Sequence, residues 1–164
     1  LKSGKQPELD TQLNSGAEVD LGAPTLIPET YLPDIHSRLV FYKRIASAED
    51  ENALQELQVE MIDRFGLLPP QVQNLFSATL VKLQLDTLQL KKCEANESMI
   101  RLQFGKQPNI DPVALIKLIQ NHPKQYQLKG QSELKYFDDF PEVDDRLAAI
   151  KLLLATIANK EPAC

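Results

Sequence analysis

The spacing of apolar residues changes character partway along this 164-residue chain. Over roughly the first half, apolar side chains recur three and four residues apart, which is the period of an amphipathic helix. Later, Ile100, Leu102 and Phe104 alternate with polar residues, which is the period of a strand. The chain is therefore predicted to have an α+β fold: a helical N-terminal half of three helices, followed by short antiparallel strands with two further helices.

The helix boundaries follow from capping residues. The first helix is expected over 34–46, and the second after Ser47 as its N-cap, with Gly66 near its end. The third is expected to begin at Pro69-Pro70, because proline suits the first turn of a helix. On the first helix one face is expected to carry Ile35, Leu39, Tyr42 and Ala46.

The second half alternates short strands with helices. A fourth helix is expected to begin at Asp111-Pro112, as N-cap and first helical residue. The last helix is expected over 143–159, with its apolar face inward. Strands are expected at 90–94, 100–104, 126–129 and 133–137, the last two joined through Gly130.

Composition divides the chain into three parts. Residues 1–17 are polar and are expected to form a flexible leader. Residues 18–33 mix apolar residues with three prolines, which forbid a regular helix, so an extended Pro-rich arm is expected there. Residues 34–160 are expected to form the folded domain.

Charge and cysteine usage limit the possible partners. The formal net charge of −5 disfavours a domain whose main task is to grip nucleic acid. No run approaches the ~20 apolar residues of a membrane span, so no membrane contact is expected. Cys93 and Cys164 are too few and too far apart for a disulfide framework or a metal site, which favours a reduced, cytoplasmic location.

The chain carries no motif of a catalytic or cofactor site. Gly105-Lys106 lacks the remaining residues of a phosphate-binding loop, and there is no nucleophile elbow. His36 and His122 are isolated from each other and from the cysteines. No enzyme activity, cofactor or metal is therefore expected for this chain.

The clearest functional signal lies on the second helix. Leu54, Leu57, Met61 and Phe65 form a stripe that should face the core. The outward face is expected to carry Glu56, Val59, Glu60 and Asp63. An apolar residue among carboxylates resembles the centre and rim of a protein-docking patch. The alternative is a solvated acidic face with one stray valine, since single exposed apolar residues are common.

Two further charged groups admit alternatives. Arg38, Lys43 and Arg44 on the first helix could contact phosphates, or be solvated, or pair with neighbouring acids. An acidic run could hold a divalent metal, or could cap and solvate the N-terminus of the last helix. This run consists of Asp138, Asp139, Glu142, Asp144 and Asp145.

Several blocks of the chain resemble the bacterial transcription-repair coupling factor, in its C-terminal domain. The most characteristic is Leu57-Gln-Val-Glu-Met-Ile-Asp-Arg-Phe-Gly-Leu-Leu-Pro69. It is preceded by Glu18-Val-Asp-Leu21, Leu26-Ile-Pro-Glu29, Tyr31-Leu-Pro-Asp34, Arg38-Leu39 and Tyr42-Lys-Arg-Ile-Ala46. The resemblance extends over roughly 18–158, and the leader resembles the tail of the preceding motor module.

The resemblance implies a function for this domain and for the full protein. The full protein would be a cytoplasmic ATP-dependent DNA translocase, a helicase-like hydrolase with ATP and Mg in its upstream motor. It would displace stalled RNA polymerase and recruit nucleotide-excision repair. The family's terminal domain docks on the N-terminal UvrB-like module and masks the surface that recruits UvrA. The family's two docking acids fall on Glu60 and Asp63 of this chain.

The chain is therefore expected to be an autoinhibitory protein-interaction domain, with Glu60 and Asp63 as docking residues from the resemblance. Glu56 and Val59 join them from helical geometry alone. An accessory DNA-binding domain of the same translocase is the alternative, although no direct contact with nucleic acid is expected.

Overall fold

The computed structural model describes residues 16–159, and its elements confirm the predicted α+β class. Three helices come first: α2 (Ile35–Ala46), α3 (Glu51–Phe65) and α4 (Pro70–Leu88). Two more helices follow, α5 (Pro112–Asn121) and α6 (Val143–Ile157). The strands are β1 (Glu18–Asp20), β2 (Leu90–Ala95), β3 (Met99–Phe104), β4 (Tyr126–Lys129) and β5 (Glu133–Phe137).

The described residues divide into two compact units. The first is Ala23–Leu83, and the second combines Ala17–Gly22 with residues 84–159. The Pro-rich stretch 18–33 contributes to both units, because it supplies β1 to the second and Ile27 and Leu32 to the core of the first. Residues 1–15 of the predicted leader lie outside the described residues.

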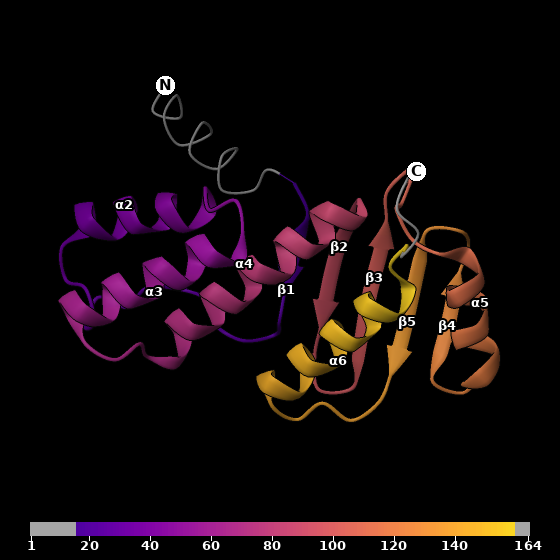
Figure 1. The fold of residues 1–164 in the computed structure, drawn as a ribbon. Coiled ribbons are helices and arrows are strands. Elements are labelled where there is room, and N and C mark those ends of the chain that lie inside the picture. The colour runs from indigo at the N-terminus through magenta and orange to yellow at the C-terminus, as the bar shows by residue number, and fades with distance from the viewer. Residues whose placement is uncertain (1–15, 160–164) are drawn as a thin grey trace, which may run out of the picture. The chain divides into compact units, whose positions relative to one another are not determined.

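The first unit is built from α2, α3 and the first part of α4 (Figure 1). Asp34 caps α2 by accepting a hydrogen bond from the backbone N of Ser37 at 3.0 Å. α3 ends at Gly66, whose φ of 100° is readily adopted by glycine but not by residues with a side chain. The core of the unit contains Ile27, Leu32, Phe41, Ile45, Leu54, Leu57, Met61, Val72 and Phe76.

Two local predictions for this unit are wrong. Ser47 is the C-cap of α2, and the N-cap of α3 is Asp50, which accepts from the backbone N of Ala53 at 2.8 Å. On α2 the buried residues are Phe41 and Ile45, whereas Ile35 and Leu39 are 65% and 44% exposed. The stripe containing Phe41 is selected because its ring packs edge-to-face on Phe65 of α3, with centroids 5.6 Å apart.

The second unit is a five-stranded sheet in the order β1-β2-β3-β5-β4. All neighbouring strands are antiparallel except β1, which pairs with β2 in parallel. α6 lies over the sheet and α5 lies beside β4 (Figure 1). One face of the sheet carries the fully buried side chains Cys93, Ile100, Leu102 and Leu134, and α6 contributes Ile150, Leu153, Leu154 and Ile157.

A buried arginine ties β1 to α6. Arg146 is only 5% exposed. Its Nε donates to the carbonyl of Phe140 at 3.0 Å, and its Nη1 donates to the carbonyl of Leu21 at 2.8 Å. Nη2 donates to Pro141 at 3.3 Å. This guanidinium therefore satisfies the carbonyl of Leu21, directly after β1, together with two carbonyls of the segment that leads into α6.

Candidate docking surface

The two sides of α3 differ sharply in burial. Leu54, Leu57 and Met61 are 2%, 7% and 0% exposed, which confirms the predicted core stripe. The opposite side carries Val59, whose side chain is 59% exposed. This contrast is what helical periodicity predicts for a helix that lies on the surface of its unit.

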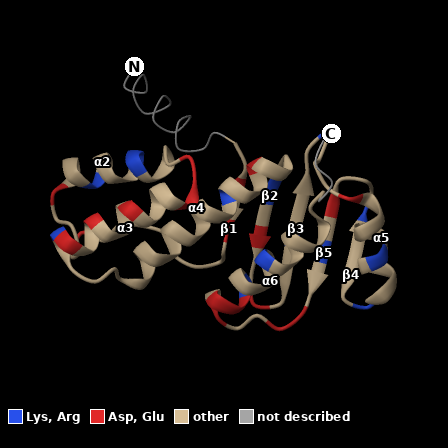
Figure 2. Cartoon of the chain, in the orientation of Figure 1, with Lys and Arg blue, Asp and Glu red and all other residues tan. Residues whose placement is uncertain are grey.

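Carboxylates flank the exposed valine. Glu56 and Asp63 are both exposed, and Figure 2 shows the acidic residues along α3. Glu56 accepts one hydrogen bond, from Asn52 Nδ2 at 3.3 Å. Within residues 16–159, the side chain of Asp63 makes no ion pair or hydrogen bond. Both carboxylates are therefore open to a partner.

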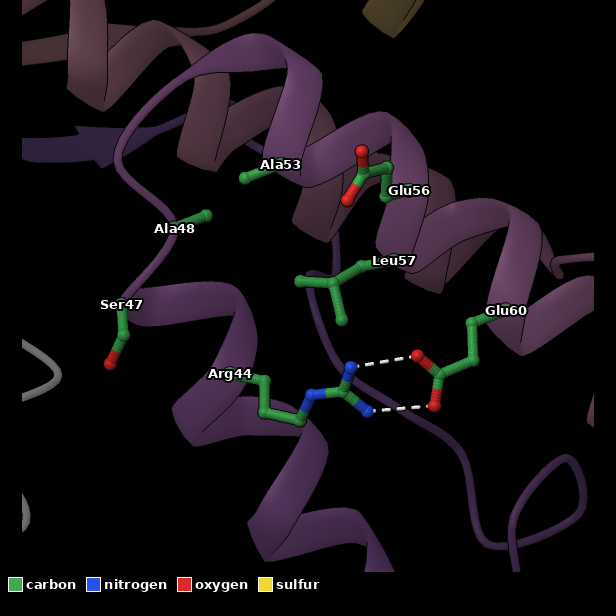
Figure 3. A pocket seen from close by; sticks show the side chains of 7 residues that line it. All are labelled: Arg44, Ser47, Ala48, Ala53, Glu56, Leu57 and Glu60. Carbon is green, nitrogen blue, oxygen red and sulfur yellow. Dashed lines mark hydrogen bonds and ion pairs between the residues drawn. The ribbon is translucent and has the colours of Figure 1, made fainter.

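Glu60 lies elsewhere than the sequence predicted. It was expected on the outward face, but it lies on the flank of α3 that is turned toward α2. Arg44 Nη1 and Nη2 donate to its Oε2 and Oε1 at 2.8 and 2.7 Å (Figure 3). Arg64, one turn along α3, donates to Oε2 at 3.2 Å. The reason is tertiary: packing of α2 on α3 places a guanidinium beside this carboxylate.

The two guanidinium groups perturb the titration of this carboxylate. They lower the pKa of Glu60 from 4.5 to about 2, with the Arg44 hydrogen bonds as the main cause and Arg64 as the lesser one. The same contact raises the pKa of Arg44. Glu60 is consequently ionised and already paired, while its side chain remains 35% exposed.

The ion pair stands at one edge of a shallow hollow between α2 and α3. Arg44, Ser47, Ala48, Ala53, Glu56, Leu57 and Glu60 line this hollow of about 370 Å³ (Figure 3). Its lining combines one guanidinium and two carboxylates with apolar groups.

Two of the three basic residues considered for phosphate contact bind other groups within the first unit. Arg38 Nη1 donates to the carbonyls of Leu32 and Pro33 at 2.8 and 3.0 Å. Arg44 is bound to Glu60. Only Lys43 remains exposed without a partner in the described part of the chain. Pairing with a neighbouring acid, one alternative weighed from the sequence, is therefore what occurs at Arg44.

Members of the acidic run make local contacts at the start of α6 and just after β5. The backbone N of Glu142 donates to Asp145 Oδ2 at 3.1 Å, which helps cap the helix. Asp138 accepts from Gln125 Nε2 at 3.1 Å and from the Tyr136 hydroxyl at 3.2 Å. Across residues 16–159, no three His, Cys, Asp or Glu side chains gather as metal ligands.

Among the described helices none is long and apolar enough to span a membrane.

Sequence reasoning missed two exposed apolar residues next to the acidic face. Ile62 is 38% exposed, and Leu67, just beyond α3, is 85% exposed. The helical period could have indicated Ile62, which lies one turn after Val59. No local pattern distinguishes Leu67 from a buried loop residue.

Comparison with known proteins identifies related chains. A sequence model of the TRCF domain family matches residues 21–115. The chain is 39% identical over 151 residues to the transcription-repair-coupling factor of Escherichia coli (strain K12), covering 92% of this chain and 13% of that protein. It is 38% identical over 158 residues to the Haemophilus influenzae protein of the same name, covering 96% of this chain and 14% of that one.

A solved structure is also similar. The crystal structure of the C-terminal domain of transcription-repair coupling factor superposes with a TM-score of 0.72 at 27% sequence identity. The match covers 89% of this chain and 97% of that chain. The chain thus spans a small part of the two bacterial relatives but nearly all of that solved domain.

Proposed function

This chain belongs to the TRCF domain family, with the fold of the C-terminal domain of a transcription-repair coupling factor, and we propose that it is an autoinhibitory docking domain. In this proposal it docks on the N-terminal UvrB-like module of the same factor and masks the surface that recruits UvrA. The whole factor would be a cytoplasmic ATP-dependent DNA translocase that acts on stalled RNA polymerase in nucleotide-excision repair.

One observation carries the proposal: Val59 is 59% exposed between two open carboxylates, on a helix whose other side is fully buried. An apolar centre with a charged rim is the anatomy of a protein interface. Carboxylates in such a rim suit arginine, which binds them with two parallel hydrogen bonds. The partner surface is accordingly proposed to present arginines around an apolar contact.

Glu60 takes a second role in this proposal. Its pair with Arg44 joins α2 to α3 and holds the docking helix in place. An ionised carboxylate has about four lone-pair sites, so Glu60 can accept another N–H while Arg44 remains bound. Glu60 would therefore support the surface from its edge, with Asp63, Glu56 and Val59 at the contact.

A masking domain must also be able to leave. Interfaces between domains of one chain commonly bury about 600–1,500 Å², which suits moderate affinity. Tethering within one protein raises the effective concentration, so weak contacts are enough to keep the mask closed. A release signal then acts by binding the open state more tightly than the closed one.

Titration calorimetry of this chain against the N-terminal module tests the proposal. Wild-type chain should bind, and Glu56→Lys plus Asp63→Lys should weaken binding strongly. A matched control is Glu97→Lys plus Asp139→Lys, which adds the same charge at exposed positions of the second unit. Loss of binding in both double variants would indicate only a net-charge effect, and unchanged binding in both would exclude this face of α3.

A further inference from the structure

Leu67 is exposed just beyond the C-terminus of α3. It follows Gly66, and its 85% exposure is the largest among the big apolar residues of 16–159. Packing within the described residues therefore gives no reason for a leucine at this position.

The loop that presents Leu67 is held on both sides. The Tyr31 hydroxyl donates to the carbonyl of Gly66 at 2.8 Å and to that of Met61 at 3.2 Å. On the far side, Gln73 Nε2 donates to the carbonyl of Leu68 at 3.0 Å. A side chain on a loop fixed in this way loses little further freedom when a partner covers it.

Leu67 borders a hollow next to the acidic face. The hollow measures about 490 Å³ and is lined by Gln58, Ile62, Leu67, Leu68, Gln73 and Ser77. Three of these residues are apolar, three are neutral polar, and none is charged. The hollow thus offers an apolar contact with a hydrogen-bonding rim.

The hollow and the acidic face are continuous along α3. Ile62 lies one turn beyond Val59 and directly before Asp63. Residues three apart are neighbours on a helix surface, so a module seated on Val59 and Asp63 also covers Ile62. The same partner that meets the carboxylates therefore reaches the hollow.

We propose that Ile62 and Leu67 are the apolar anchor of the docking surface, and that the hollow receives an aliphatic or aromatic side chain of the N-terminal module. This inference rests on the proposed docking function. In this proposal the apolar anchor and the exposed acids have different roles. The anchor would set how long the docked state lasts, and the exposed acids would steer the encounter and select arginine-bearing partners.

The test uses the full-length factor and measures its affinity for UvrA, which reports the unmasked fraction. Leu67→Ser should raise the apparent affinity about tenfold, toward the value of a factor that lacks this domain. The gain should persist between about 0.05 and 0.5 M salt, whereas the gain from Asp63→Asn should shrink over that range. Leu67→Met should keep the mask closed.

Leu152→Ser is the matched control, because Leu152 is 70% exposed on α6 and lies outside the docking surface. It should leave UvrA affinity unchanged. If deleting the whole domain does not raise UvrA affinity, the masking function itself fails. If deletion raises it but Leu67→Ser behaves like Leu152→Ser, masking stands and the anchor is wrong. Equal gains in both serine variants would also overturn the anchor.

Discussion

Arg44 on α2 and Glu60 on α3 form a two-pronged ion pair, with the guanidinium donating to both carboxylate oxygens at 2.8 and 2.7 Å. The two residues are 16 positions apart in the sequence and come together only because their helices pack. The pair gives α3 a fixed neighbour, and the folded chain contains Glu60 in its ionised form.

Glu60→Gln should change how stability depends on pH. The pKa of Glu60 is lowered from 4.5 to about 2 in the folded chain, chiefly by Arg44. A depressed carboxyl pKa stabilises the fold above pH 4.5, and this contribution is lost as the pH falls toward about 2. The thermal midpoint of Glu60→Gln should therefore lie below that of wild type near neutrality and approach it at acid pH.

Circular dichroism melts from neutral pH down to about 2.5 measure this difference in thermal midpoint between Glu60→Gln and wild type. Glu56→Gln on the same helix serves as the control, since Glu56 has no arginine partner within the described residues. The thermal midpoint of Glu56→Gln should equal that of wild type at each pH. If the difference in thermal midpoint between Glu60→Gln and wild type stayed constant with pH, the ion pair would not be what stabilises the fold. Added salt should narrow this difference, because the pair is partly exposed.

Charge reversal should separate folding from docking. Glu60→Lys places a third cation beside Arg44 and Arg64, so it should lower the thermal midpoint as well as weaken docking. Asp63→Lys should weaken docking alone, because Asp63 makes no ion pair in residues 16–159. Melts of the isolated chain combined with calorimetry against the N-terminal module distinguish the two effects. Equal destabilisation by both variants would contradict this division of roles.

Arg146→Met should destabilise the second unit. The side chain is buried and satisfies carbonyls of Leu21, Phe140 and Pro141. Removing the donors leaves those oxygens unpaired, at a cost of about 2–4 kcal/mol in the free energy of unfolding. Urea unfolding measures this value. Lys151→Met, at an exposed position of the same helix, should change it by less than about 0.5 kcal/mol. A neutral Arg146→Met would mean that water replaces the guanidinium.

Two glycines with similar backbone angles should respond differently to alanine. Gly22 and Gly130 have φ of 70° and 63°, so each variant carries the left-handed penalty of about 1–2 kcal/mol. A Cβ at Gly22 would also lie 2.8 Å from the carbonyl oxygen of Ala95, whereas at Gly130 nothing lies within 4 Å. Gly22→Ala should therefore cost about 1–3 kcal/mol more than Gly130→Ala in urea unfolding. Equal costs would show that β1 shifts freely away from β2.

Cys93 should react with thiol reagents only when the chain unfolds. Its side chain is fully buried on β2, and this burial raises the pKa of the thiol to about 12. Cys164→Ser removes the other cysteine, which lies outside the described residues. In that background, labelling at about pH 8 should follow the urea unfolding curve. Rapid labelling of the native chain would indicate local opening of β2.

Much of the fold was predictable because its signals are local. Strand alternation located β4 and β5, and the Asp111-Pro112 pair marked the start of α5. The core side of α3 followed from its apolar period alone, so Val59, Glu56 and Asp63 were correctly placed outside. In each case the deciding residues lie within a few positions of one another.

What the sequence left undecided depends on residues that are distant along the chain. β1 is a strand only because β2 offers it an edge, and Arg146 binds the next residue, Leu21, from 125 positions away. On α2, two apolar stripes were available, and contact with Phe65 selected the one that contains Phe41. The spacing of apolar residues indicates that a helix face is apolar. It does not indicate which of two apolar faces a neighbouring helix will cover.

The candidate site shows the same difference between what local sequence determines and what tertiary contacts determine. The sequence by itself determined that α3 has a buried face and an acidic face, because helical geometry relates residues three and four positions apart. Tertiary structure alone decided that Glu60 turns to Arg44 and that Leu67 remains uncovered beside Ile62. Burial and ion pairing are properties of what surrounds a side chain, and these surroundings are assembled from segments that no local pattern connects.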